Sequence, residues 1–380
     1  MPTPTFASAR FRVEAASGVG EEEWDELVSA NQGPLRHRFI EAWRRVELAG
    51  LQSVPLVARE DGEVVAAVHA YAYDMDMAAG VDARLERAVG LLRRVWPRAL
   101  VARVFEIGTP TPVVNPFLAR GEPREEVIDA LVEAALARAG DAGAQLMIVQ
   151  NFESEAYRVG IAASLESHGF EPLPIPPTVV LQLPYSSFDE YLDAMRSQYR
   201  RRARKVIEQS SHLEPVALHD FAEPAQELAR LWHLVWSRAK ELKREVLPAA
   251  FFEAASALDY VTVLALRRPD GSIASYALLL EDRPWLHFLY TGFEREAGEQ
   301  EGAYFRLIYE IARYAIENHF PSVNLGMTTI EPKLDAGGTV VPLLAWVRHR
   351  RPLLHRVSIA LGRGPLAPKP VPPRQVFKSG

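Results

Sequence analysis

Residues 322–338 read Ser322-Val-Asn-Leu-Gly-Met-Thr-Thr-Ile-Glu-Pro-Lys333-Leu-Asp-Ala-Gly-Gly338. This stretch follows an amphipathic helical pattern over 303–318 and precedes an apolar run over 340–347. It therefore predicts a strand, a glycine break, a short turn carrying one lysine, a glycine pair and a final strand. A turn of this kind at the end of a strand is suited to holding an acyl group, which makes Lys333 the first candidate site residue.

Length and composition limit the possible classes of protein. A chain of 380 residues exceeds one ordinary hydrophobic core and predicts two domains. The absence of cysteine excludes disulfides, thiolate metal sites and cysteine nucleophiles. A net charge of −6 argues against nucleic-acid binding by bulk electrostatics. No apolar run approaches the roughly 18 residues of a membrane span, and the first residues lack a signal-peptide pattern. We therefore expect a cytoplasmic enzyme.

The two halves of the chain repeat one order of elements. Asp61-Gly62 lies between two apolar runs, as does Asp270-Gly271, and each pair predicts a hairpin. Each hairpin is followed by a strand, a helix and another strand. Strands that alternate with helices around one sheet predict an α/β (α+β) fold, here present twice.

Proline-rich stretches suggest where the domains end. We expect a break over 172–177, between a first domain at 1–180 and a second at 181–362. The second domain would begin with a basic helix over 190–210, and a Pro-rich tail would follow over 363–380.

The order of elements is similar to that of the N-acetyltransferase (GNAT) fold. Together with the lysine turn, it resembles Fem-type (FemAB-like) peptidyl and aminoacyl transferases and related N-acyltransferases, over roughly residues 10–360. The resemblance implies two GNAT-like acyl-CoA N-acyltransferase domains in tandem. It also implies transfer of an acyl or aminoacyl group from an activated carrier to an amine.

The densest charge run is 196–205, in which six of ten residues are cationic. On one helix, Arg200, Arg201 and Arg204 would project opposite an apolar stripe. We take that stripe to be Leu192, Met195, Tyr199, Ala203 and Val206. The arginines could hold coenzyme A, a carrier-protein phosphopantetheine or the acceptor end of a tRNA. The alternative is a solvated basic face.

The resemblance implies that the pyrophosphate of coenzyme A binds at the start of a helix, as it does in GNAT enzymes. The matching residues here are Arg295, Gly298 and Gly302, although their spacing departs from the family pattern. Acidic residues that oppose phosphate surround them, namely Glu294, Glu296, Glu299 and Glu301. The alternative is a glycine-rich turn and helix cap.

Lys333 could stabilise negative charge on an acyl oxygen, with Gly326 beside it at the strand end. Tyr290 and Thr291 end the preceding strand, where Tyr290 could act as a general acid or bind the acyl group. The alternatives are a surface lysine and an aromatic residue that packs in the core.

Three carboxylates at strand ends in the first half are candidates for binding an amine acceptor or serving as a base: Asp74, Asp76 and Glu106. Isolated carboxylates at such positions can equally be solvated.

The sequence lacks the motifs that mark other common enzyme reactions. The chain has no phosphate-binding loop, nucleophile elbow, dinucleotide fingerprint or metal-ligand spacing. We therefore expect an N-acyltransferase that has no metal or permanently bound cofactor, with acyl-CoA or a similar thioester as donor and direct attack by a small-molecule or peptide amine. Two alternatives stay open: an aminoacyl-tRNA-dependent Fem-like peptide ligase, and a non-catalytic GNAT-fold binding protein.

Overall fold

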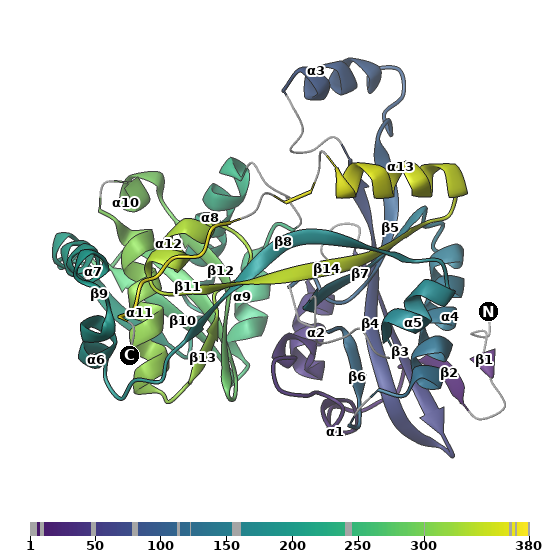
Figure 1. Cartoon of the computed structure of the whole chain (residues 1–380), viewed down its shortest axis with the longest axis horizontal. Helices are drawn as coiled ribbons and strands as arrows, with labels where there is room; N and C mark the ends of the chain where they lie inside the picture. Colours follow the sequence, from purple (N-terminus) through teal and green to yellow (C-terminus); the bar gives the residue numbers. More distant parts are fainter. Residues whose placement is uncertain are drawn as a thin grey trace. The chain divides into compact units, whose positions relative to one another are not determined.

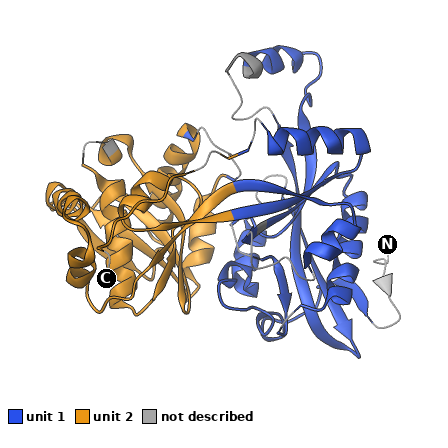
Figure 2. Ribbon diagram, viewed as in Figure 1, with its two compact units in different colours: residues 1–175, 239–245, 343–367 blue, residues 176–238, 246–342, 368–380 orange. Residues whose placement is uncertain are grey.

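The computed structural model describes residues 6–7, 11–46, 51–77, 83–111, 115–121, 123–153, 161–239, 245–299, 301–364, 367–368 and 371–378. The chain forms two compact units (Figure 2). The first is built mainly from residues 1–175 and 343–367, and the second from residues 176–238, 246–342 and 368–380.

The first unit is a mixed sheet covered by helices (Figure 1). Its strands are β1 (Phe6–Ala7), β2 (Arg12–Ala15), β3 (Gln52–Glu60), β4 (Glu63–Asp76), β5 (Val101–Ile107), β6 (Phe117–Ala119), β7 (Leu146–Glu153) and most of β14 (Thr339–His349). Its helices are α1 (Glu21–Asp25), a 3-10 turn (Gly33–Leu35), α2 (His37–Arg45), α3 (Ala83–Leu92), α4 (Glu125–Asp141), α5 (Ile161–Ser167) and α13 (Pro352–Arg363).

The second unit has the same kind of sheet. Its strands are β9 (Glu214–Leu218), β10 (Val261–Arg267), β11 (Ile273–Asp282), β12 (Trp285–Phe293), β13 (Ser322–Asn324) and most of β8 (Glu171–Gln182). Its helices are α6 (Phe188–Ala194), α7 (Ser197–Gln209), α8 (Ala225–Arg238), α9 (Ala249–Ser256), α10 (Arg295–Glu299), α11 (Ala303–Glu317) and α12 (Ile330–Asp335).

The pairing of strands repeats between the units. The orders β2-β3-β4-β5-β7 and β9-β10-β11-β12-β13 each contain three antiparallel pairs followed by one parallel pair. A crossover helix joins each parallel pair, α4 in the first unit and α11 in the second. Both Asp-Gly hairpins form, and Asp61 and Gly62 take positive φ values of 52° and 92°. The predicted α/β class is confirmed.

The outermost strands beside the parallel pairs are exchanged along the chain. β8 follows β7 in sequence but pairs antiparallel with β13. β14 follows β13 in sequence but pairs antiparallel with β7. Residues 343–367 therefore belong to the first unit. The two units are thus not two consecutive blocks of the sequence.

Three local predictions were wrong. The proline-rich stretch 172–177 lies within strand β8 rather than in a break. The basic helix does not contain Met195, whose extended backbone separates α6 from α7 and pairs with Phe377. The last residues are also not a detached tail, because Val376 is 2% exposed and its carbonyl accepts the backbone N–H of Arg196 at 2.8 Å.

Neighbouring residues of β11 show how the second sheet is covered on both faces. The Tyr276 hydroxyl donates to the carbonyl of Leu228 in α8 at 3.1 Å. Ala277 instead joins the core that contains Leu307 and Ile311 of α11. Because side chains alternate along a strand, α8 and α11 pack on opposite faces.

Gly292 shows how closely α8 approaches β12. An added Cβ would lie 2.4 Å from Cε1 of Tyr276 and 2.7 Å from the backbone nitrogen of Trp232. Gly292→Ala should therefore lower the free energy of unfolding by about 1–3 kcal/mol, because neither neighbour can retreat without repacking. Urea unfolding followed by circular dichroism measures the change.

Gly140→Ala is the matched control. Gly140 lies in α4, and an added Cβ there would meet nothing within 4 Å. Alanine is the better helix former, so this variant should be neutral or slightly stabilising. Equal destabilisation by both substitutions would contradict the close approach of α8 to β12.

Candidate active site

The candidate site is built on the parallel pair β12 and β13 of the second unit. Their ladder has only three positions and ends where His287 is opposite Asn324. Beyond it, β13 continues along β8, because Leu325 donates its N–H to Val179 at 2.8 Å and Gly326 accepts from Val179 at 3.2 Å. Gly326 then turns the chain with φ of 78°, a conformation that favours glycine.

A bulge in β12 lies just past the same point. Phe288 is opposite Leu279 and Tyr290 is opposite Leu278, so Leu289 is the extra residue. A bulge re-aims the side chains that follow it. Phe288 accordingly packs in the core that contains α11, whereas the Tyr290 ring contacts Trp232 of α8 at a centroid distance of 5.0 Å.

Lys333 returns to this strand end. It lies in α12, and its side-chain Nζ donates to the carbonyl of Gly326 at 3.3 Å. The ammonium also lies 5.7 Å from the ring centroid of Phe288. Lys333 is only 2% exposed, so it is a buried cation and not a surface lysine. The predicted lysine turn is a short helix, and Lys333 and Gly326 are brought together as predicted.

Contacts that sequence reasoning missed hold α12 in place. The Tyr191 hydroxyl from α6 donates to the carbonyl of Ala336 at 2.5 Å. Asp335 forms ion pairs with both Arg202 of α7 and Arg374. These residues are far apart in sequence, so no local pattern marks them. Their effect is to fix the position of the lysine backbone.

Thr291 has a hydrogen-bond partner in the sheet, and Tyr290 packs against the helices α8 and α9. The Thr291 hydroxyl donates to the carbonyl of Tyr276 at 2.8 Å. Tyr290 is 5% exposed and also faces the ring of Phe251 at 6.2 Å. These contacts match the core-packing alternative for Tyr290.

His287, at the last paired position of β12, was also missed. Its ring nitrogen Nε2 lies 3.7 Å from a carboxylate oxygen of Asp282, and both side chains are buried. A lone histidine in an apolar strand carries no sequence signal that would have singled it out.

The glycine loop before α11 carries less unpaired negative charge than its sequence suggests, so it opposes phosphate less strongly. Glu294 pairs with Arg230 at 2.9 Å. Glu301 pairs with Arg268 at 3.2 Å, and although burial acts to raise its pKa, hydrogen bonds from Arg268 and His212 bring that pKa below its ordinary value. Arginine therefore neutralises two of the four glutamates around this loop, Glu294 and Glu301.

Of the predicted phosphate-binding residues there, Gly302 caps α11 with φ of 66° and Gly298 packs against the ring of Phe293. Arg295 is exposed in α10.

The basic helix α7 presents its arginines to solvent. Arg200 and Arg204 both lie near Asp193, at 3.7 Å and 3.4 Å, and Arg201 is exposed. This helix therefore keeps both predicted interpretations, an anion-binding face and a solvated face.

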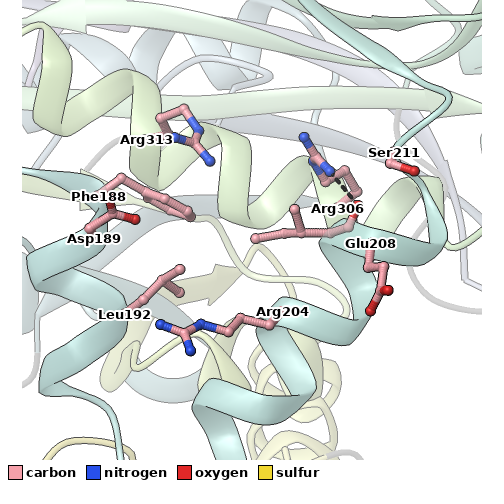
Figure 3. A pocket seen from close by; sticks show the side chains of 9 residues that line it. Phe188, Asp189, Leu192, Arg204, Glu208, Ser211, Arg306 and Arg313 are labelled. Atoms are coloured by element: carbon pink, nitrogen blue, oxygen red, sulfur yellow. Dashed lines mark hydrogen bonds between the residues drawn. The ribbon is translucent and has the colours of Figure 1, made fainter.

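Arg204 also lines a hollow of about 400 Å³ (Figure 3). Arg306 and Arg313 of α11 line it too, and both pair with buried Glu310, at 2.6 Å and 3.1 Å. The other lining residues are Phe188, Asp189, Leu192, Ile207, Glu208 and Ser211. Because acids accompany the arginines, the hollow is not a simple phosphate cradle.

In the first unit, the two aspartates at the end of β4 are paired. Asp74 contacts Arg98 at 2.7 Å and Arg103 at 3.3 Å. Asp76 contacts Arg93 at 2.6 Å. Both side chains are 40% exposed, so they are partly solvated as in the predicted alternative, but they are paired and not isolated.

Glu106 differs from them because it is fully buried. It accepts the hydroxyl of Tyr73 at 2.8 Å. On the neighbouring strands, Nε2 of His69 lies 2.8 Å from the Ser53 hydroxyl and Nδ1 lies 2.7 Å from the carbonyl of Gly108. The first unit thus contains a buried polar cluster that includes one predicted residue, Glu106.

Comparison with known proteins identifies the second unit. Residues 194–332 match the sequence model of the acetyltransferase (GNAT) domain family. The chain carries a GNAT domain. The match runs from α7 into the start of α12 and ends one residue before Lys333. It includes the ladder between β12 and β13, so the predicted resemblance to GNAT acyltransferases is confirmed.

Solved structures extend the likeness to most of the chain. A crystal structure of FemX has a TM-score of 0.59 at 13% identity and covers 89% of this chain and 98% of its own. The C-terminal domain of a putative lysylphosphatidylglycerol synthetase from Agrobacterium fabrum has a TM-score of 0.54 at 14% identity, covering 90% and 97%. Saccharomyces cerevisiae N-myristoyltransferase has a TM-score of 0.50 at 10% identity, covering 92% and 81%. These likenesses establish the fold.

A curated relative is similar in sequence. The putative 8-amino-7-oxononanoate synthase 2 of Mycobacterium tuberculosis is 26% identical over 310 residues. The match covers 79% of this chain but spans only 40% of the length of that relative.

Two features are absent from the described residues. Among them, no helix has the length and apolar character needed to cross a membrane. Within the same residues, no group of three or more His, Asp or Glu side chains is placed to hold a metal ion.

His69 gives the first unit a testable pH dependence. Burial lowers the pKa of its imidazole from 6.5 to about 4. As the pH falls from 6.5 to about 4, His69 therefore takes up a proton in the unfolded chain but not in the folded chain. The unfolding free energy should fall between pH 6.5 and pH 4, by roughly 3 kcal/mol at most.

The measurement is the thermal midpoint of the native chain and of His69→Gln at pH 7 and pH 5. The variant removes the titrating group, so its midpoint should fall less over this interval. Parallel losses in the two proteins would show that His69 does not contribute.

Proposed function

We propose that the chain is an N-acyltransferase whose reaction centre lies where β12 and β13 stop pairing. The observation that carries this proposal is Lys333, a buried ammonium held at the carbonyl of Gly326, one residue beyond the match to the GNAT domain family. A fixed positive charge in a buried site stabilises negative charge that develops nearby, and it does so more strongly than in water.

The proposed reaction needs no side-chain nucleophile. A neutral amine attacks the carbonyl carbon of a thioester, and its oxygen becomes negative as the tetrahedral intermediate forms. The ammonium of Lys333 stabilises this oxyanion. The intermediate then collapses, the carbon–sulfur bond breaks, the amine proton is lost and the donor leaves as a thiol. The helix contacts of Tyr191 and Arg202 serve to keep the lysine in register with the strand end.

Acyl-CoA is the preferred donor. N-myristoyltransferase, which has this fold, was solved with bound myristoyl-CoA. In our chain, Arg230 and Arg268 neutralise Glu294 and Glu301 before α11, which reduces the negative charge that would oppose phosphate near that helix start.

The acceptor is proposed to be a small-molecule or peptide amine. The Mycobacterium tuberculosis relative is named for a product that bears both an amino group and a keto group. Amino acids and amino ketones are therefore the first acceptors to test.

Aminoacyl transfer from tRNA is the second candidate. The exposed Arg201 and Arg204 on α7 favour it, as does the FemX fold. A polyanionic donor would bind with strong salt dependence, because its phosphates release counterions, whereas acyl-CoA would show a weaker dependence.

Lys333→Met tests the proposed centre. With a panel of acyl-CoA and aminoacyl-tRNA donors, the variant should lower kcat by about 100-fold, as expected for loss of an oxyanion donor. The thermal midpoint should change little, because methionine fills a buried site of similar length. Lys333→Arg should recover only part of the activity, since a planar guanidinium does not replace a compact ammonium.

Lys378→Met is the control, because it removes an exposed ammonium from the same unit. It should leave kcat unchanged. If Lys333→Met retains near-native turnover, the reaction centre is elsewhere. If the native chain turns over none of the donors yet still binds one, the non-catalytic alternative is favoured.

A further inference from the structure

Large apolar side chains are exposed mainly in two segments of the first unit. Among the residues whose exposure the structure describes, ten of the twelve strongly exposed ones lie there: Met77, Leu91, Leu92, Val95, Trp96 and Leu100 around α3, and Leu353, Leu354, Val357 and Leu361 on α13. Single exposed apolar residues need no explanation, but clusters of this kind mark interaction surfaces. We call these two segments together the apolar-basic surface.

On α13 the apolar stripe points away from the protein. Leu353, Val357 and Leu361 recur every four residues and are 72%, 46% and 43% exposed. The opposite side of the helix is the packed one, because Ile359 is 5% exposed and His355 lies 3.3 Å from Glu171. A helix that buries one side would ordinarily place polar residues on the other. The outward leucines therefore need a partner.

The segment around α3 repeats this character. Figure 1 shows α3 standing out from the body of the first unit, at the same end of the view as α13. Trp96 is 62% exposed and Val95 is 88% exposed. Tryptophan is enriched where one side of a surface is apolar and the other is wet, as at a membrane interface.

The charge of both segments is strongly positive. Residues 348–364 contain five arginines and no acidic residue, and residues 84–98 contain five arginines and one glutamate. Of these arginines, Arg93 forms an ion pair with Asp76, Arg98 with Asp74 and Arg363 with Glu171. The whole chain nevertheless has a net charge of −6. Positive charge is therefore concentrated where the apolar side chains are exposed, as it also is over residues 196–205, while the remaining chain is acidic.

We propose that the apolar-basic surface docks the protein onto an anionic phospholipid surface, with α13 lying in the interface plane. Exposed leucine, valine and tryptophan would enter the acyl boundary, and the arginines would contact the headgroups. Self-association through this surface is disfavoured, because it would bring two arginine-rich faces together. This inference does not depend on the proposed transfer reaction.

The experiment is co-sedimentation of the full chain with vesicles of 30% phosphatidylglycerol and 70% phosphatidylcholine, and with pure phosphatidylcholine. The native chain should bind the anionic vesicles, and binding should weaken as salt rises from 0.1 M to 0.5 M because headgroup attraction is screened. The triple variant Leu353→Gln, Val357→Gln, Leu361→Gln should lower the partition coefficient by at least about tenfold.

Val246→Gln is the matched control, because Val246 is an apolar residue that is 40% exposed outside this surface. It should bind vesicles like the native chain. Circular dichroism checks that the triple variant is folded, and Val95→Ser with Trp96→Ser gives an independent second variant. Lack of binding to anionic vesicles would overturn the proposal. If the native chain then sediments as a dimer and the triple variant as a monomer, the surface joins two copies instead.

Discussion

The short ladder between β12 and β13 is the constraint on which the site depends. Two parallel strands that pair over only three positions must separate, and the separation occurs where β12 bulges and β13 turns at Gly326. Lys333 places its ammonium on the carbonyl at this point. A buried lysine is costly unless it has polar contacts, so its position reflects the backbone geometry around it. The chemistry we propose uses that same positive charge.

The surrounding structure keeps this strand end fixed. β8 supplies the backbone hydrogen bonds that carry β13 past the ladder, although β8 follows the first unit in sequence. Tyr191 of α6, Arg202 of α7 and Arg374 near the C-terminus all hold α12. Segments that are far apart in the chain thus all contact one short helix or its C-cap residue. Such convergence explains why the lysine can be held without a long element of its own.

Sequence reasoning predicted what local patterns encode. The Asp-Gly hairpins, the crossover helix over 303–318 and the lysine segment were predicted because each has a turn or periodicity signal. The exchange of β8 and β14 was not predicted, because the choice of partner strand depends on contacts between residues that are far apart in sequence. The hydrophobic character of 172–182 indicates a strand only once its partner β13 is known. The prolines in this stretch led us to predict a break instead of a strand.

The site shows the same division. Lys333 and Gly326 were chosen as candidates from their spacing in one segment, and the structure places them in contact. Tyr191, Arg202 and His287 were missed because their roles depend on contacts across the fold. Asp74 and Asp76 were singled out from their strand-end positions, yet the structure pairs both with arginines. A carboxylate at a strand end is informative only when its neighbours in space are known.

The most direct test of the central claim is a crystal structure of the full chain with a non-hydrolysable thioether analogue of acyl-CoA. The account predicts the acyl carbonyl beside the ammonium of Lys333, at the point where β12 and β13 stop pairing. Density for the acyl group at any other place in the chain, with Lys333 still bound only to the protein, would contradict it.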